Sequence, residues 1–241
     1  MKRKGGITLK NITNTRPDLE LQGRLLYTVQ YVDDEDIKGK DVLDIGCGYG
    51  WFELNAIKKG VNKISGIEIT DQDLKTARKY IKDERAEFHV GSGIQIPFPN
   101  ESFHSVVSWE VIEHIPKDTE EKMFFEVSRV LKDNGVFYLS TPFRSFFSTI
   151  LDPAWWLIGH RHYSKNKLES ISSKFDFKIE KIEVKGSWWE IAYLWNFYIS
   201  KWLFRRNPFF NDYLNHKRSQ EYQKKNGNFI IFIKMRKGPF K

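Results

Sequence analysis

The residues with the clearest chemical potential lie in a glycine-rich segment at positions 41–50. Apolar residues interrupted by one carboxylate, Asp44, lead into glycines at alternate positions, Gly46, Gly48 and Gly50. The apolar part predicts a short strand, and the residues that follow have the spacing of a helix. Because glycine has no Cβ, the backbone N–H groups of such a turn can approach a ligand closely. The segment therefore predicts a site for a nucleotide-like ligand.

Two carboxylates restrict which ligand this loop would hold. Asp44 would repel a pyrophosphate, and the dinucleotide fingerprint would need its third glycine where this chain has Trp51. A carboxylate instead suits a ligand that carries an ammonium and a sulfonium. Glu68 follows the loop by about twenty residues, at the end of a second predicted strand, where it can accept hydrogen bonds from both hydroxyls of a ribose.

A second group of chemically active residues follows another predicted strand. Glu110, Glu113 and His114 are spaced i, i+3 and i+4, so they would share one face if a helix began here. They could then present two oxygens and a nitrogen to a divalent metal, with His160 or His162 as a further ligand. The interpretation that we favour is a capped helix start without a metal, in which His114 faces the substrate. In both cases His114 is the best-placed base, because the ordinary pKa of imidazole lies near neutrality.

The elements that must position these residues alternate along the chain. Apolar patterns predict strands at 41–45, 63–69, 87–90, 103–109, 136–140 and 175–185, and helices within 19–32 and at 51–59, 71–81 and 119–131. Strands that alternate with helices are typical of a doubly wound parallel sheet. The order brings the glycine loop, Glu68 and His114 to one edge of that sheet, where ligands bind in such folds.

Composition limits the cellular context. The chain has 241 residues, enough for one α/β domain with insertions or two small domains. Residues 1–18 are polar and are expected to form an irregular arm, and no apolar run follows the basic start, so a signal peptide is not expected. Cys47 is the single cysteine, which excludes an intramolecular disulfide and makes the cytoplasm the expected location. The net charge of +8 is compatible with nucleic acid, anionic lipid or a solvated surface.

The late part of the chain is unusually aromatic. Residues 188–204 are apolar on nearly all sides, but Glu190, Asn196 and Lys201 make this segment a poor membrane span. It could be a buried cap helix that packs on the aromatic segment 143–156. It could also be an interfacial helix that turns basic residues, Lys201, Arg205 and Arg206, towards anionic lipid. We expect residues 187–210 to form a helical lid that meets segment 143–156 above the substrate pocket.

Several landmarks, in their order and spacing, resemble the class I S-adenosylmethionine (SAM) methyltransferases, and within them the type 11 subgroup. They are the loop 42–50, Glu68, the turn 96–98, the run 111–114, the approach 131–136 to the fifth strand, and the turn 162–164 before a helix. The resemblance covers roughly residues 20–185 and 228–236. It implies a Rossmann-like, seven-stranded, mostly parallel sheet with helices on both faces, a seventh strand at 229–233, and an aromatic helical insertion, 186–227, before that strand.

The resemblance also implies SAM as the cofactor. The residues expected to bind it are Asp44, Gly46, Cys47, Gly48, Gly50, Glu68, Ile69, Ser92, Gly93 and Trp109. At Ser92 the chain departs from the family, which usually has an aspartate that accepts the adenine amino group. A serine can still accept a hydrogen bond. Some relatives, the ubiquinone-type O-methyltransferases and the plant small-RNA 2′-O-methyltransferases, bind a divalent metal with a similar Glu-x-x-Glu-His run, and many others have the run without a metal.

The predicted function is methyl transfer from SAM, with an oxygen of a small or lipid-linked molecule as the expected acceptor and peripheral contact with an anionic membrane. Two alternatives remain open. The positive charge suits an RNA methyltransferase, although the basic residues are scattered and no RNA-binding module is evident. A SAM-fold binding protein that has lost its chemistry is the other, and the intact glycine loop argues against it.

Overall fold

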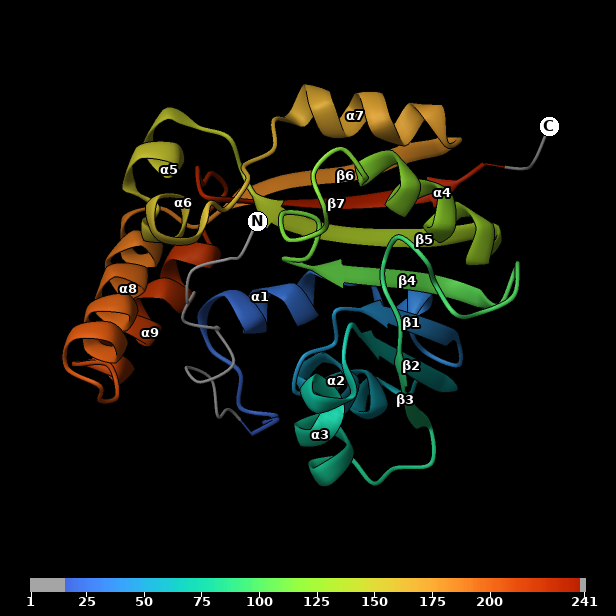
Figure 1. Ribbon diagram of the computed structural model, residues 1–241, viewed down its shortest axis with the longest axis horizontal. Helices are drawn as coiled ribbons and strands as arrows, with labels where there is room; N and C mark the ends of the chain where they lie inside the picture. The colour runs from blue at the N-terminus through green and yellow to red at the C-terminus, as the bar shows by residue number, and fades with distance from the viewer. Residues whose placement is uncertain (1–15, 239–241) are drawn as a thin grey trace, which may run out of the picture.

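The computed structural model describes residues 16–238 (Figure 1). Most of the predicted arm 1–18 therefore lies outside the described residues. Residues 16–18 of that arm belong to no helix or strand.

One seven-stranded sheet organises the described chain, in the order β3-β2-β1-β4-β5-β7-β6. Its strands are β1 (Asp41–Ile45), β2 (Lys63–Glu68), β3 (Ala86–Val90), β4 (Phe103–Trp109), β5 (Leu131–Pro142), β6 (Phe177–Lys185) and β7 (Ile230–Lys237). Strands β1 to β5 pair in parallel, and β7 runs antiparallel between β5 and β6. Because β7 is antiparallel to both neighbours, β6 runs parallel to β5, as expected. The predicted fold class is confirmed.

Helices cover both faces of this sheet. On one face α4 (Glu120–Val130) and α7 (Lys165–Lys174) pack on alternate side chains of the strands through Phe124, Val127, Leu168 and Ile171. On the other face lie α1 (Gly23–Tyr31) and α2 (Trp51–Lys59), while α3 (Asp71–Tyr80) packs on β2 and β3. Each layer buries an apolar face, which is why the strands between them are apolar nearly throughout.

Aromatic residues, and not the leucines, form the buried face of α1. Leu25 and Leu26 are only half-buried, and the buried aromatic residues are Tyr27 and Tyr31. Their rings lie 5.0 and 5.4 Å from the ring of Phe232 on β7. A tyrosine ring reaches further than leucine and can keep its hydroxyl hydrogen-bonded, so the two tyrosines fill the space against the sheet.

The aromatic insertion forms a helical hairpin. Helix α8 (Trp188–Tyr198) continues into a π-helical turn, η3 (Ile199–Leu203), and the chain returns as α9 (Asn211–Tyr222), which packs on α8 and α1. The Glu221 carboxylate of α9 accepts hydrogen bonds from the N–H groups of Ser187, Trp189 and Glu190, so it caps the start of α8. Within residues 16–238 no helix is both long and apolar enough to span a bilayer.

The second aromatic segment lies beside this hairpin. It folds as α5 (Phe146–Leu151) and α6 (Pro153–Ile158), and Trp195 of α8 donates its indole N–H to the Leu151 carbonyl at 3.0 Å. In Figure 1 α5, α6, α8 and α9 gather at the left, beyond the carboxyl ends of β4 and β5. The expectation that the two aromatic segments meet at the ligand-binding edge is therefore confirmed.

Candidate active site

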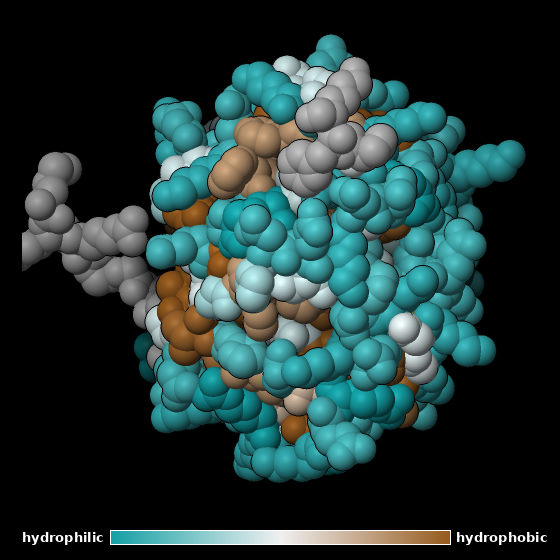
Figure 2. All heavy atoms as spheres, turned by 90° about the vertical axis from the view of Figure 1, so that its right-hand side faces the viewer, coloured by the Kyte–Doolittle hydropathy of each residue, from teal (hydrophilic) through white to brown (hydrophobic). Residues whose placement is uncertain are grey.

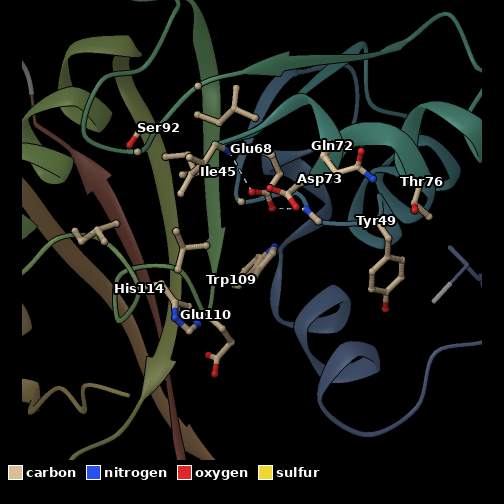
Figure 3. Close-up of a pocket in the computed structure, with 18 of the residues that line it drawn as sticks. Ile45, Tyr49, Glu68, Gln72, Asp73, Thr76, Ser92, Trp109, Glu110 and His114 are labelled. Atoms are coloured by element: carbon tan, nitrogen blue, oxygen red, sulfur yellow. Dashed lines mark hydrogen bonds between the residues drawn. The ribbon is translucent and has the colours of Figure 1, made fainter. Parts of the chain in front are cut away.

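The carboxyl ends of β1, β2, β3 and β4 surround a cavity of about 520 Å³, here called the loop cavity (Figure 3). It lies where the sheet order reverses, since β1 has β2 on one side and β4 on the other. Doubly wound sheets bind their ligands at this reversal point. Of the predicted cofactor residues, the cavity is lined by Gly46, Gly48, Glu68, Ile69, Ser92, Gly93 and Trp109.

The glycine loop leaves room for a ligand, although its N–H groups are used differently than expected. A Cβ on Gly48 would meet no atom within 4 Å, so the space over this residue is open. The N–H groups of Gly46 and Cys47 donate to the Ile67 carbonyl at 2.9 and 3.2 Å, and that of Gly48 donates to Glu68 Oε1 at 2.9 Å. These bonds tie the loop to β2 and fix the Glu68 carboxylate at the cavity wall.

Gly50 has a structural role behind this wall. Its φ is +86°, and a Cβ there would lie 2.5 Å from Ile81 Cδ1. The loop can therefore pack against the end of α3 only with glycine at this position. Gly50 does not line the cavity.

Asp44 lies beneath the loop and not in the cavity, which corrects the expectation that it contacts the ligand. Leu43 and Ile45 point to the face covered by α4, so alternation along β1 turns Asp44 to the opposite face, where its neighbour is Glu53 of α2. Both carboxyl groups are buried, and burial raises the pKa of each. The charge of Glu68 raises the pKa of Asp44 further, and the charge of Asp44 raises that of Glu53. Cys47 is also buried outside the cavity lining.

The other wall of the loop cavity contains residues that were not predicted. They are Tyr49 of the loop and three polar residues from the first turns of α3, Gln72, Asp73 and Thr76. Figure 3 shows the Glu68 and Asp73 side chains close together beside the loop. The start of α3 follows Glu68 directly, so the polar residues of that helix were a signal available in the sequence.

Trp109 supplies an unused hydrogen-bond donor. The residue is buried, lines the cavity, and its Nε1 has no hydrogen-bond partner within residues 16–238. A buried donor without a partner is costly unless a ligand accepts its bond. Open space over Gly48, the Glu68 carboxylate and this donor fit a nucleoside with a polar tail.

No helix begins at Glu110, so the predicted set of Glu110, Glu113 and His114 does not share a face. Glu110 has φ 57° and residues 111–115 form turns. The Glu110 carboxylate is engaged by Arg24 of α1 at 3.0 Å and by the Ser140 hydroxyl at 2.8 Å. These partners hold the Glu110 carboxylate in the wall of the cavity. Both of its oxygens are engaged there, so they are not available to bind a metal.

His114 lies instead against His160. The Nε2 atoms of the two rings are 3.1 Å apart, and His160 Nδ1 is 4.0 Å from the Asp152 carboxylate. Burial lowers the pKa of His114, with a further contribution from Arg161, and burial next to His114 lowers the pKa of His160 to about 4. Both rings are therefore neutral at neutral pH.

A different trio could present ligand atoms to a divalent metal. One atom each of Glu113, His114 and His160 lies within 4.8 Å of the others. Glu113 Oε2 accepts a hydrogen bond from Thr141 at 3.1 Å, and burial raises the pKa of this carboxyl well above its ordinary value. His162 does not join the trio, because it bonds the Asp152 carboxylate at 2.9 Å.

Arg161, which the sequence analysis did not single out, holds the turn that carries His114. Its guanidinium donates to the carbonyls of Ile112, Glu113 and Ile115 at 2.6, 3.1 and 2.7 Å, and to the Glu120 carboxylate at 2.9 Å. A rigid planar donor suits such a cluster of carbonyls. The only signal in the sequence is the position of Arg161 between two histidines.

A second cavity of about 710 Å³, here called the helical cavity, adjoins the first. Residues from α1, the α5–α6 junction, α8 and α9 line it, among them Arg24, Thr28, Asp152, Ala154, Tyr193, Phe197, Asn215 and Arg218. Tyr49, Trp109, Glu110 and His114 line both cavities. The two spaces therefore meet beside His114.

Comparisons with known proteins agree with this geometry. Residues 42–135 match the family described as "Methyltransferase domain". A sterol 24-C-methyltransferase of Gibberella zeae is 32% identical over 103 residues, 41% of this chain and 27% of that protein. Ajmaline N-methyltransferase of Rauvolfia serpentina is 31% identical over 105 residues, 42% of this chain and 35% of that protein. The chain thus spans only about a third of the length of these relatives.

Solved structures show the same fold over most of the chain. A SAM-dependent methyltransferase from Mesorhizobium loti superposes with a TM-score of 0.61 at 16% identity, covering 87% of this chain and 95% of that one. Phosphoethanolamine N-methyltransferase 2 of Haemonchus contortus, solved with S-adenosylhomocysteine, gives a TM-score of 0.62 at 21% identity, covering 84% and 49%. Residues 42–135 thus match a methyltransferase domain, and the described chain around them has the fold of SAM-dependent methyltransferases.

Proposed function

We propose that the protein transfers a methyl group from SAM, bound in the loop cavity, to an oxygen of a small or lipid-linked acceptor in the helical cavity. The observation that carries this proposal is the shared wall of the two cavities, formed by Tyr49, Trp109, Glu110 and His114. Two substrates bound in the two cavities would lie next to each other there, which favours an aligned in-line transfer.

In the loop cavity, different residues would contact different parts of SAM. Glu68 would accept hydrogen bonds from the ribose hydroxyls, and Ser92 and Gly93 would lie along the adenine. Trp109 Nε1 would donate to a polar group of the ligand. When bound, SAM supplies a methyl group that its sulfonium makes electrophilic. The protein then has to align the acceptor and remove one proton.

His114 is the proposed base, and its neighbours select the nitrogen that acts. The Asp152 carboxylate is hydrogen-bonded to His162, and its charge, 4.0 Å from His160 Nδ1, favours a proton on that nitrogen by electrostatic attraction alone, which leaves His160 Nε2 as an acceptor. The Nε2–H of His114 then donates across the 3.1 Å contact, and the lone pair of His114 resides on Nδ1. The lowered pKa of His114 keeps this base unprotonated near neutral pH.

The acceptor proposed here combines polar and apolar parts. The helical cavity offers Arg24, Asn215 and Arg218 to polar groups, and Tyr193 and Phe197 to an apolar part. The matched relatives methylate different atoms, since their names include N- and C-methyltransferases. Oxygen is proposed because a neutral imidazole can take the proton of a hydroxyl as the methyl group arrives.

Labelled SAM tests the function. The protein is incubated with methyl-labelled SAM and separate lipid, RNA and soluble-metabolite extracts, with His114→Asn and Glu68→Ala as controls. Label in the lipid or metabolite fraction that both variants reduce is the expected result, and methyl ether or ester products would identify oxygen. Label in the RNA fraction alone would show that the acceptor is RNA and not a small or lipid-linked molecule. Binding of S-adenosylhomocysteine without transfer to any fraction would support the non-catalytic alternative.

A further inference from the structure

Most of the exposed large hydrophobic side chains of the described chain gather at one end of the molecule. They form what is here called the aromatic face, which consists of Phe146, Phe147, Ile150, Trp155, Trp156 and Leu157 from α5 and α6, and Trp188, Trp195, Ile199, Leu203 and Phe204 from α8, η3 and the residue that follows. Phe146 and Leu203 are the two most exposed residues of this face, with 74% and 72% exposure. Contiguous patches of this kind on soluble proteins mark interaction sites.

The two halves of this face are in direct contact. The rings of Phe147 and Trp188 lie 5.9 Å apart, and the indole of Trp195 donates to Leu151. Along α8 the exposed positions Trp188, Trp195 and Ile199 fall on one side, while Tyr193 and Phe197 line the helical cavity. The helices that carry the aromatic face are thus also walls of that cavity.

Two of the four indole N–H groups of this face already have acceptors within the protein. Trp156 Nε1 donates to the Ile150 carbonyl at 2.8 Å, and Trp195 Nε1 donates to the Leu151 carbonyl at 3.0 Å. Moving these rings out of water therefore breaks no indole hydrogen bond, and the usual cost of burying a polar group is avoided.

Within the segments that form the aromatic face, all exposed charges are positive. Within residues 143–158 and 188–210 the only acidic residues are Asp152 and Glu190, which are 2% and 0% exposed. Arg144, Arg205 and Arg206 are exposed in the same segments. Figure 2 views the side of the molecule that lies on the right in Figure 1, away from these helices, and that side is mainly hydrophilic.

We propose that the aromatic face docks the protein on an anionic bilayer, with the rings of α5, α6 and α8 at the level of the headgroups. Exposed aromatic and aliphatic side chains, in segments whose exposed charges are all cationic, complement a negatively charged lipid surface. No described helix is long and apolar enough to span a membrane, so the contact is peripheral. The complementarity of charge favours this occupant over a second copy of the chain, because two such faces would bring like charges together.

Flotation with liposomes tests the proposal without any need for turnover. Vesicles of phosphatidylcholine with 30% phosphatidylglycerol are compared with pure phosphatidylcholine, at low and high salt. The protein should float with the anionic vesicles, and less so at high salt. The double variant Phe146→Ser/Leu203→Ser should weaken vesicle binding at least about tenfold, since each substitution removes exposed apolar surface. Phe125→Ser on α4, at a residue 54% exposed outside the aromatic face, is the matched control and should bind like the parent.

Further measurements distinguish loss of membrane binding from misfolding and from dimer formation. Affinity for S-adenosylhomocysteine should be unchanged in all variants, which shows that they fold. Arg205→Ser/Arg206→Ser should reduce binding to the anionic vesicles and leave little salt dependence. No flotation of the parent protein would overturn the proposal, and so would equal binding by the Phe146/Leu203 variant. A concentration-dependent dimer in light scattering that the same variant abolishes would also overturn it, by assigning the face to a second copy.

Discussion

The loop cavity and the helical cavity share a wall, but the chain builds them by different means. Backbone turns and strand ends form the loop cavity around Glu68, most of them in succession between residues 45 and 93, and the turn that follows β4 completes the wall. The helical cavity instead combines α1, the α5–α6 junction and the α8–α9 hairpin, which are far apart in the sequence. Its wall contains a buried ion pair, Arg218 with Glu190 at 2.7 Å, and Arg24 bound to Glu110. The loop cavity is thus fixed mainly by local backbone geometry, and the helical cavity by long-range side-chain contacts.

Substitutions in the walls of the two cavities should therefore have different effects: some should lower kcat, some the stability of the fold, and some the affinity for the cofactor. The largest effect is expected at His114, where the two cavities meet. His114→Asn should lower kcat by about 10²- to 10⁴-fold, the usual contribution of a general base. Affinity for S-adenosylhomocysteine, measured by calorimetry, should stay within about twofold. His89→Asn on β3, with its ring 44% exposed, is the matched control. Equal kcat for the two variants would remove His114 from the chemistry.

The next effect concerns the stability of the acceptor side. Arg218→Met leaves the Glu190 carboxylate buried without its partner, and breaking a buried pair in this way costs about 3–5 kcal/mol. Denaturant unfolding should show this loss. Arg236→Met breaks a pair with Glu180 in which both side chains are about one-third exposed, so it should cost about 1 kcal/mol or less. Similar losses for the two variants would contradict the view that buried ion pairs hold this side together.

On the cofactor side, Glu68→Ala should weaken binding of S-adenosylhomocysteine by about 1.5–3 kcal/mol, or roughly 10- to 100-fold, because it removes charge-assisted hydrogen bonds. It also removes the acceptor of the Gly48 N–H. Glu87→Ala on β3, which lines neither cavity, should bind like the parent protein. Tight binding of NAD by the parent, with no response to S-adenosylhomocysteine, would overturn the assignment of the cavity.

A smaller effect is expected beneath the glycine loop. Burial raises the pKa of Glu53 above its value in the unfolded chain, so unfolding releases a proton and the free energy of unfolding falls as pH rises between the two pKa values. Glu53→Gln removes this titration. Its stability relative to the parent should therefore increase from pH 5 to pH 8, as thermal unfolding would show. A constant difference across this range would show that Glu53 does not titrate between the two states.

The smallest effect is expected on removal of metal. A metal ligand must be deprotonated, and the raised pKa of the buried Glu113 carboxyl disfavours that form. Chelation should therefore change kcat by less than about twofold. Loss of turnover that Mg²⁺ or Mn²⁺ restores would instead assign Glu113, His114 and His160 as ligands.

The contrast between the loop cavity and the helical cavity also explains which site residues could be predicted from the sequence. Glu68 was predictable because a strand end after a glycine loop fixes its place in any doubly wound sheet. The burial of Asp44 on the face opposite to Leu43 and Ile45 was predictable from the alternation of side chains along a strand. The prediction of a ligand contact rested instead on its negative charge beside the glycine loop. The left-handed backbone of Glu110 has no such signal, and it replaced the expected helix by turns.

Side-chain partnerships across the fold could not be predicted at all. Arg161 contacts the turn at 112–115 from about fifty residues away, and His160 approaches His114 through the same segment. Neither contact follows from local periodicity. Helix α9 also went unpredicted, since its polar sequence gives a weak pattern, and its place is fixed by packing on α1 and α8.

The α8–α9 hairpin leaves and re-enters the sheet at neighbouring points. Lys185, the last residue of β6, is the register partner of Ile230, the first residue of β7, and the Phe229 N–H donates to the Lys185 carbonyl. The two strands are therefore already joined at the point where the hairpin begins. Insertions of other lengths could replace it without moving a single strand pair. The hairpin is one contiguous stretch of the chain, so a change of that stretch alone would alter the walls of the helical cavity and leave the sheet and the glycine loop in place.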